Sequence, residues 1–181
     1  MTTINTDQQA GEPTRWSVEP GNSSVTFDVK TFWGAVTVRG AFDRFDGSYE
    51  VGPEGTKITL TVDVDSLDTG NAKRDKHLRS EDFFHLAAHP QVRFTSTRVR
   101  PAGDGMLLVE GNLEAAGQVV PLELGATVRQ ADGGLEITGT TALDPGSFGM
   151  SRGQFGMIRP LATLSVTAHL NEDTSSIEAA A

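Results

Sequence analysis

The sequence contains no cysteine and no apolar run that approaches the ~18 residues of a membrane-spanning helix. Without cysteine, the chain can form no disulfide, no thiolate metal site and no thiol nucleophile. Positive charge is also scarce, because 15 Lys and Arg stand against 24 Asp and Glu and give a formal net charge of -9. This balance argues against nucleic acid and anionic membrane surfaces as partners, since both are bound through positive charge.

The two ends of the sequence differ from its middle. Residues 1–14 have neither the basic start nor the apolar segment of a signal peptide, and they are polar and aperiodic. We predict a disordered segment over residues 1–14, one folded domain over residues 15–170 and a flexible tail over residues 171–181. The chain is expected to be soluble and cytoplasmic, with a processed exported form as the alternative.

Most of the middle alternates apolar and polar residues, the pattern of half-buried β-strands. One short run begins at Trp16, and eight long runs begin at Val25, Val36, Ile58, Val92, Leu107, Val120, Leu135 and Leu164. Turns are predicted at Asp46-Gly47 and at Gly117. The short connections predict antiparallel pairing, and a long antiparallel sheet avoids exposed edges as a barrel or a sandwich. A barrel of about eight strands can be filled by side chains or can hold one small ligand.

Residues 67–84, LDTGNAKRDKHLRSEDFF, interrupt this pattern. Asn71 is placed to act as the N-cap of a short helix over Ala72 to Leu78, with its side-chain oxygen accepting a backbone N–H. Phe83 and Phe84 are too apolar to be left in water. We therefore expect them to pack against, or into, the mouth of the sheet structure.

The inward-facing positions are consistent with either a packed core or a cavity. The large members are Phe27, Val29, Val38, Phe42, Leu60, Val62, Phe94, Val109, Leu113, Leu122, Leu124, Ile137 and Val166. Small members, which favour enclosed space, are Gly111, Ala126, Gly139, Thr141 and Ala168. The glycine-rich loop 144–160 carries Phe148, Met150, Phe155 and Met157, which suit either a lid over an apolar ligand or a surface loop with buried anchors.

Residues 74–84 read RDKHLRSEDFF and resemble the RDxHLRSxDFF signature of the YceI-like proteins. Flanking segments resemble the same family: WSVEPGNSSVTFDVK at 16–30, SLDTG at 66–70, HPQVRFTS at 89–96, GNL at 111–113, VPL at 120–122 and FGM at 148–150. The resemblance implies an extended, lipocalin-like, eight-stranded antiparallel barrel with one short helical insertion. It also implies that a long isoprenoid chain, from a polyprenyl lipid or an isoprenoid quinone, binds in an apolar tunnel.

The chain departs from this family at several polar positions. Where members commonly carry histidines and an arginine, it has Asn22-Ser23, Thr31, Ala115-Ala116-Gly117 and Asp144-Pro145-Gly146-Ser147. We expect these residues to lie near the polar end of the tunnel. A buried phosphate without such donors would be costly, so the expected ligand has a neutral or weakly polar head group.

The resemblance and the alternation together give the predicted site. The apolar tunnel is predicted to comprise Phe27, Val29, Phe42, Leu60, Val62, Leu78, Phe83, Phe84, Phe94, Leu113, Leu122, Phe148 and Met150. A polar mouth is predicted from Arg74, Asp75, His77 and Arg79. The same residues could equally form a structural knot, in which Asp75 and Asp82 pair with Arg74 and Arg79. No catalytic residue, metal site or required cofactor is predicted.

The predicted function is that of a non-catalytic carrier for an isoprenoid or similar apolar lipid. One alternative is a structural or protein-interaction barrel with a filled core, and another is an enzyme that uses His77 with Asp75 as an acid–base pair. His85 and His89 have a spacing that could ligate a metal, but Pro90 and the lack of a third ligand argue against it. The predicted partners are an apolar lipid and, optionally, a second copy of the chain. Nucleic acid and stable membrane insertion are not expected.

Overall fold

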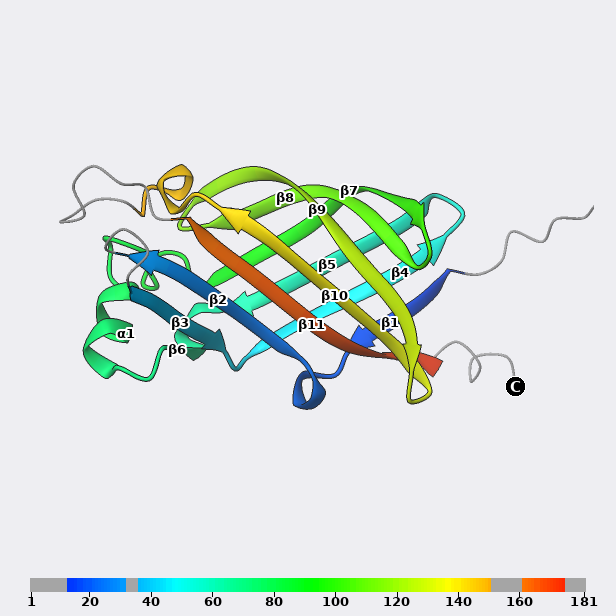
Figure 1. Ribbon diagram of the computed structural model, residues 1–181, viewed down its shortest axis with the longest axis horizontal. Helices are drawn as coiled ribbons and strands as arrows, with labels where there is room; N and C mark the ends of the chain where they lie inside the picture. The colour runs from blue at the N-terminus through cyan, green and yellow to red at the C-terminus, as the bar shows by residue number, and fades with distance from the viewer. Residues whose placement is uncertain (1–12, 32–35, 151–160, 175–181) are drawn as a thin grey trace, which may run out of the picture.

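The computed structural model describes residues 13–31, 36–150 and 161–174. Over these ranges the chain forms an elongated antiparallel β-barrel with α1 at one end (Figure 1). Eight strands close the ring in the order β1-β4-β5-β7-β8-β9-β10-β11, and β11 pairs back with β1. The predicted all-β, eight-stranded barrel with one helical insertion is therefore confirmed.

The secondary-structure elements alternate strands with a few short helical turns. The strands are β1 (Thr14–Val18), β2 (Ser24–Thr31), β3 (Val36–Phe42), β4 (Phe45–Gly52), β5 (Gly55–Asp63), β6 (Leu67–Asp68), β7 (Gln91–Gly103), β8 (Met106–Ala115), β9 (Gln118–Ala131), β10 (Gly134–Leu143) and β11 (Ala162–Glu172). The helical elements are the α-helix α1 (Ala72–Leu78) and the 3-10 helices η1 (Pro20–Asn22), η3 (Val64–Ser66) and η4 (Pro145–Phe148). Among the described residues, no helix is long and apolar enough to cross a membrane.

Several barrel strands are built from two consecutive pieces. Both β1 and β2 pair with β11, β1 through residues 170–172 and β2 through residues 162–167. In the same way, β3 pairs with β2 while β4 pairs with β1, and β6 pairs with β3 while β5 pairs with β4. The helical insertion then carries the chain from β6 to β7 at the α1 end of the barrel (Figure 1).

The predicted turn at Asp46-Gly47 is wrong, because both residues lie inside β4. Gly47 pairs with Leu60, and a Cβ on Gly47 would lie 2.6 Å from the Thr59 carbonyl oxygen. Glycine is therefore needed there for the close approach of two strands. The reversal comes later, at residues 53–54, and is followed by Gly55 with φ of 113°.

The predicted turn at Gly117 and the predicted helix are both confirmed. Ala116 and Gly117 have φ of 49° and 76°, the positive pair that a tight hairpin turn requires. The α1 helix begins and ends at the expected residues, and the Asn71 side chain accepts a hydrogen bond from the Arg74 backbone N–H at 3.1 Å. This cap satisfies one of the four N–H groups that the first turn leaves unpaired.

At the C-terminal end, β11 continues past the predicted domain boundary at residue 170 as far as Glu172. The Asp173 N–H then donates to the Arg15 carbonyl oxygen at 2.8 Å, and the side chains of these residues form an ion pair at 3.3 Å. The first residues of the predicted tail are thus part of the barrel. The predictions for residues 1–12 and 175–181 lie outside the described residues.

Candidate functional site: an apolar cavity along the barrel

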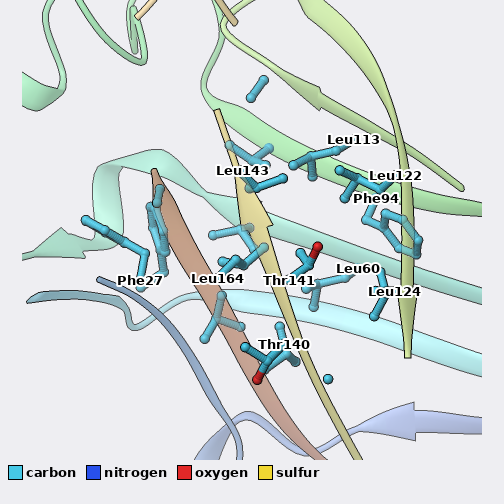
Figure 2. A pocket seen from close by; sticks show the side chains of 18 of the residues that line it. Phe27, Leu60, Phe94, Leu113, Leu122, Leu124, Thr140, Thr141, Leu143 and Leu164 are labelled. Atoms are coloured by element: carbon cyan, nitrogen blue, oxygen red, sulfur yellow. The ribbon is translucent and has the colours of Figure 1, made fainter. Parts of the chain in front are cut away.

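A cavity of about 630 Å³ lies inside the barrel. It extends from Arg74 and Phe148 at the α1 end to Val18 and Leu170, which pair at the junction of β1 and β11. Figure 2 shows side chains from several strands converging on this space. The volume falls within the roughly 300–1,000 Å³ of small-molecule pockets.

The lining is apolar because each strand turns alternate residues inward. On β10, Ile137 and Leu143 line the cavity. Glu136 points to the outer side, where its carboxylate pairs with Arg129 and with His169. The alternating residues of the sequence therefore face two sides: apolar side chains line the cavity, and charged side chains lie on the outer side of the barrel.

Two phenyl rings lie against the cavity wall, each over a glycine. A Cβ on Gly111 would meet the ring of Phe94 at 2.6 Å, and a Cβ on Gly40 would overlap the ring of Phe27. The two glycines therefore leave the room that the rings of Phe94 and Phe27 occupy. This arrangement keeps two large side chains in the lining without closing the central space.

Every residue predicted for the apolar tunnel lines this cavity: Phe27, Val29, Phe42, Leu60, Val62, Leu78, Phe83, Phe84, Phe94, Leu113, Leu122, Phe148 and Met150. Residues from the strands, from the helical insertion and from the loop after β10 thus contribute to the same cavity lining. Their role in binding remains a prediction. Phe155 and Met157 of the predicted lid lie outside the described residues.

The predicted polar mouth separates into two pairs. Arg74 and His77 line the cavity. The Arg74 guanidinium donates to the Thr69 hydroxyl at 2.8 Å and to the Thr69 carbonyl at 2.7 Å. His77 contacts the Asp82 carboxylate at 3.2 Å and packs edge-on against Phe83, with ring centroids 5.0 Å apart. Both groups are therefore already engaged by the protein.

Asp75 and Arg79 do not line the cavity and instead attach the helical insertion to the barrel. Asp75 is 7% exposed and accepts hydrogen bonds from the Thr69 backbone N–H, at 3.0 Å, and from the Thr69 hydroxyl. Arg79 donates to the carbonyl oxygens of Leu67 and Asp65. The expected pairing of Asp75 and Asp82 with the two arginines is wrong. Thr69 binds Asp75, His77 pairs with Asp82, and both arginines donate to backbone carbonyl oxygens.

The YceI-like domain model matches residues 16–170 of this sequence. The chain belongs to the YceI-like family. A UPF0312 protein of Shewanella baltica is 37% identical over 141 residues, which are 73% of each chain. A UPF0312 protein of Pectobacterium atrosepticum is 36% identical over 115 residues, which are 62% of this chain and 59% of that relative.

Solved structures show the same fold. The YceI-like barrel described here matches BcnA of Burkholderia cenocepacia with a TM-score of 0.74 and 23% identity, over 87% of this chain and 99% of that one. It matches a polyisoprenoid binding domain from Saccharophagus degradans with a TM-score of 0.70 and 15% identity, over 87% and 98% of the two chains. At these identities the likeness establishes the fold.

The residues expected near a polar end of the tunnel do not all face the cavity. Ala115 and Asp144 line it. Asn22 and Ser23 do not, because Asn22 bonds to the Glu19 carboxylate at 3.1 Å and Ser23 accepts from the His169 backbone N–H at 2.9 Å. The expectation that Asn22-Ser23 lies near a polar end of the tunnel is thus wrong.

The YceI-like cavity also uses residues that the predicted tunnel omitted. The alternating pattern could have identified them, because they continue the same strand faces: Val18, Val25, Ile58, Val92, Leu143, Leu164 and Leu170. At the Val18 end, Trp16 packs on Tyr49 with ring centroids 5.5 Å apart. Burial raises the pKa of the Tyr49 phenol above its ordinary value, although a hydrogen bond with Thr56 acts in the opposite direction.

The imidazole rings of His85 and His89 lie 5.5 Å apart, edge to face. Within residues 13–31, 36–150 and 161–174, no group of three or more His, Cys, Asp or Glu side chains is placed to hold a metal ion.

Proposed function

We propose that this protein is a non-catalytic carrier that holds a long apolar lipid of the isoprenoid class inside its barrel. The observation that carries the proposal is the cavity of about 630 Å³, lined almost entirely by aliphatic and phenyl side chains. A barrel with a filled core would have no such space. Membership of the YceI-like family and the likeness to a polyisoprenoid binding domain support the same ligand class.

The energetics favour a long chain without a required head-group contact. Each five-carbon prenyl unit that enters the cavity buries on the order of 100 Å² of apolar surface, worth about 2.5 kcal/mol before ordering costs. Several units together supply enough free energy for tight binding. Selectivity should therefore depend more on chain length and shape than on the head group.

The polar groups at the α1 end favour a neutral or weakly polar head. Arg74 donates two of its N–H groups to Thr69, and His77 is paired with Asp82. Among the described lining residues, Arg74 alone carries a permanent positive charge, so a phosphate bound here would rely on its remaining N–H groups.

The exposure of His77 supports a role other than catalysis. The side chains of His77 and Asp82 are 59% and 56% exposed. His77 thus lines the cavity at a solvent-exposed edge, whereas acid–base catalysis on an apolar ligand would need a group held against the reacting atoms inside the barrel. The edge-on contact of His77 with Phe83 instead helps to hold the Phe83 ring at the cavity.

The proposal is tested by native mass spectrometry and organic extraction of the protein purified from cells that make isoprenoid lipids. We expect a co-purified lipid that extraction removes. Returning a polyprenol or an isoprenoid quinone at about 100 times its Kd should stabilise the stripped protein by about 2.7 kcal/mol and raise its Tm by about 5–10 °C. A stripped protein with no adduct in several hosts and no shift in Tm would contradict a carrier function.

A further inference from the structure

Thr141 differs from the other polar residues that line the cavity. Those residues all have partners within the protein: Ser48 with Thr59 at 2.9 Å, Thr140 with Ser165 at 3.4 Å, Asp144 with the Gly146 N–H at 2.8 Å, Arg74 with Thr69 and His77 with Asp82. Among the described lining residues, only Thr141 has a polar side chain that makes no hydrogen bond to the protein.

The hydroxyl of Thr141 lies on the inner face of the barrel. Thr141 pairs with Leu164 across β10 and β11, and its neighbour on the same strand face toward the α1 end is Leu143. Figure 2 shows Thr141 among the labelled apolar side chains of the lining, with its oxygen pointing away from that of Thr140. The hydroxyl is therefore directed into apolar surroundings.

When an apolar chain displaces water from the cavity, a hydroxyl there costs free energy unless a partner accepts or donates a hydrogen bond. Valine has the same shape, so packing alone does not require threonine at this position. We propose that Thr141 is a polar subsite that hydrogen-bonds one neutral oxygen of the bound lipid, a prenyl alcohol hydroxyl or a quinone carbonyl.

This inference rests on the proposed carrier function and specifies the ligand further. A single hydroxyl can satisfy one neutral oxygen, whereas a phosphate needs several donors. Thr141 lies on β10 just before η4 and Phe148, so the oxygen would be held near the α1 end. The isoprenoid tail would then extend toward Val18 and Leu170.

The test compares farnesol with farnesene, a hydrocarbon of closely similar skeleton that lacks the hydroxyl. Affinities are measured by displacement of a fluorescent apolar probe from the wild-type protein and from Thr141→Val. The matched control is Thr138→Val, the same change on the same strand at a position outside the cavity lining. We expect Thr141→Val to weaken farnesol binding by about three- to tenfold and to leave farnesene binding unchanged.

The outcomes separate the subsite from the carrier function. If both ligands bind the wild type and Thr141→Val changes neither, or changes both alike, the subsite is rejected while the carrier function stands. An equal loss of farnesol binding in Thr138→Val also rejects the subsite, because that side chain does not face the lipid. If neither ligand binds the wild type, the carrier function fails, and the subsite fails with it.

Discussion

Ala126→Phe is expected to lower the affinity for a long polyprenyl chain by about 100-fold. Ala126 is 4% exposed, lines the cavity from β9 and pairs with Gly139 across the wall. A benzyl group at this position would occupy the room of a prenyl unit and block passage toward Val18. Losing about 3 kcal/mol of net burial, the contribution of one to two units, corresponds to about two orders of magnitude in Kd.

The matched control for this blockade is Thr127→Phe. Thr127 is the next residue on β9, is exposed and faces outward, so the same side chain is added on the other side of the wall. Affinity is measured by lipid titration of both variants, and thermal unfolding confirms that each is folded. Because the new ring of Ala126→Phe fills existing space, its Tm should not fall.

The blockade should also depend on ligand length. Ala126→Phe should bind a short prenyl chain, held at the α1 end, with nearly the affinity of the wild type. Its affinity for a long chain should fall almost to its affinity for the short one. Equal binding of long chains by Ala126→Phe and Thr127→Phe would show that the lipid does not occupy the barrel interior.

Asp75→Ala is expected to reduce the free energy of unfolding by about 3 kcal/mol. The buried Asp75 carboxylate accepts hydrogen bonds from both the backbone N–H and the hydroxyl of Thr69. Hydrogen bonds to a charged acceptor contribute about 1.5–3 kcal/mol each, and their loss leaves two donors without their partner. Thr69 also holds Arg74, so the change would loosen the attachment of α1 at the cavity.

Urea unfolding of Asp75→Ala, with Asp82→Ala as the control, measures this effect. Asp82 is more than half exposed and pairs with His77 at the surface, where such pairs contribute about 1 kcal/mol or less. Hydrogen exchange of the α1 amides should become faster in Asp75→Ala before the rest of the barrel opens. A stability within 0.5 kcal/mol of the wild type would show that the Asp75–Thr69 contact does not fix the helix.

Local patterns in the sequence predicted the elements that depend on neighbouring residues. Alternation identified most of the inward-facing strand residues, and Asn71 identified the start of α1, because the side chain that caps a helix lies within one turn of it. The local pattern gave a wrong prediction at Asp46-Gly47, where a turn was expected. There glycine is needed because β5 approaches closely, and a contact between two strands leaves no local mark that distinguishes it from a turn.

The hydrogen-bond partners of the site residues were harder to predict, because several partners were available to each side chain. The sequence grouped Arg74, Asp75, His77 and Arg79 as one polar mouth, but it did not indicate that Thr69 would bind both Arg74 and Asp75. Thr141 was recognised only as a small inward residue. Its unpaired hydroxyl becomes visible only when the partners of every other polar residue in the lining are known.

The most direct test of a lipid-binding barrel is a crystal structure of the stripped protein reconstituted with a polyprenol or an isoprenoid quinone. Occupation of the cavity predicts continuous elongated density from the Arg74 and Phe148 end toward Val18 and Leu170, in contact with Phe27 and Phe94. An interior filled by the protein's own side chains, with the lipid absent or bound only to the outer surface, would contradict the account.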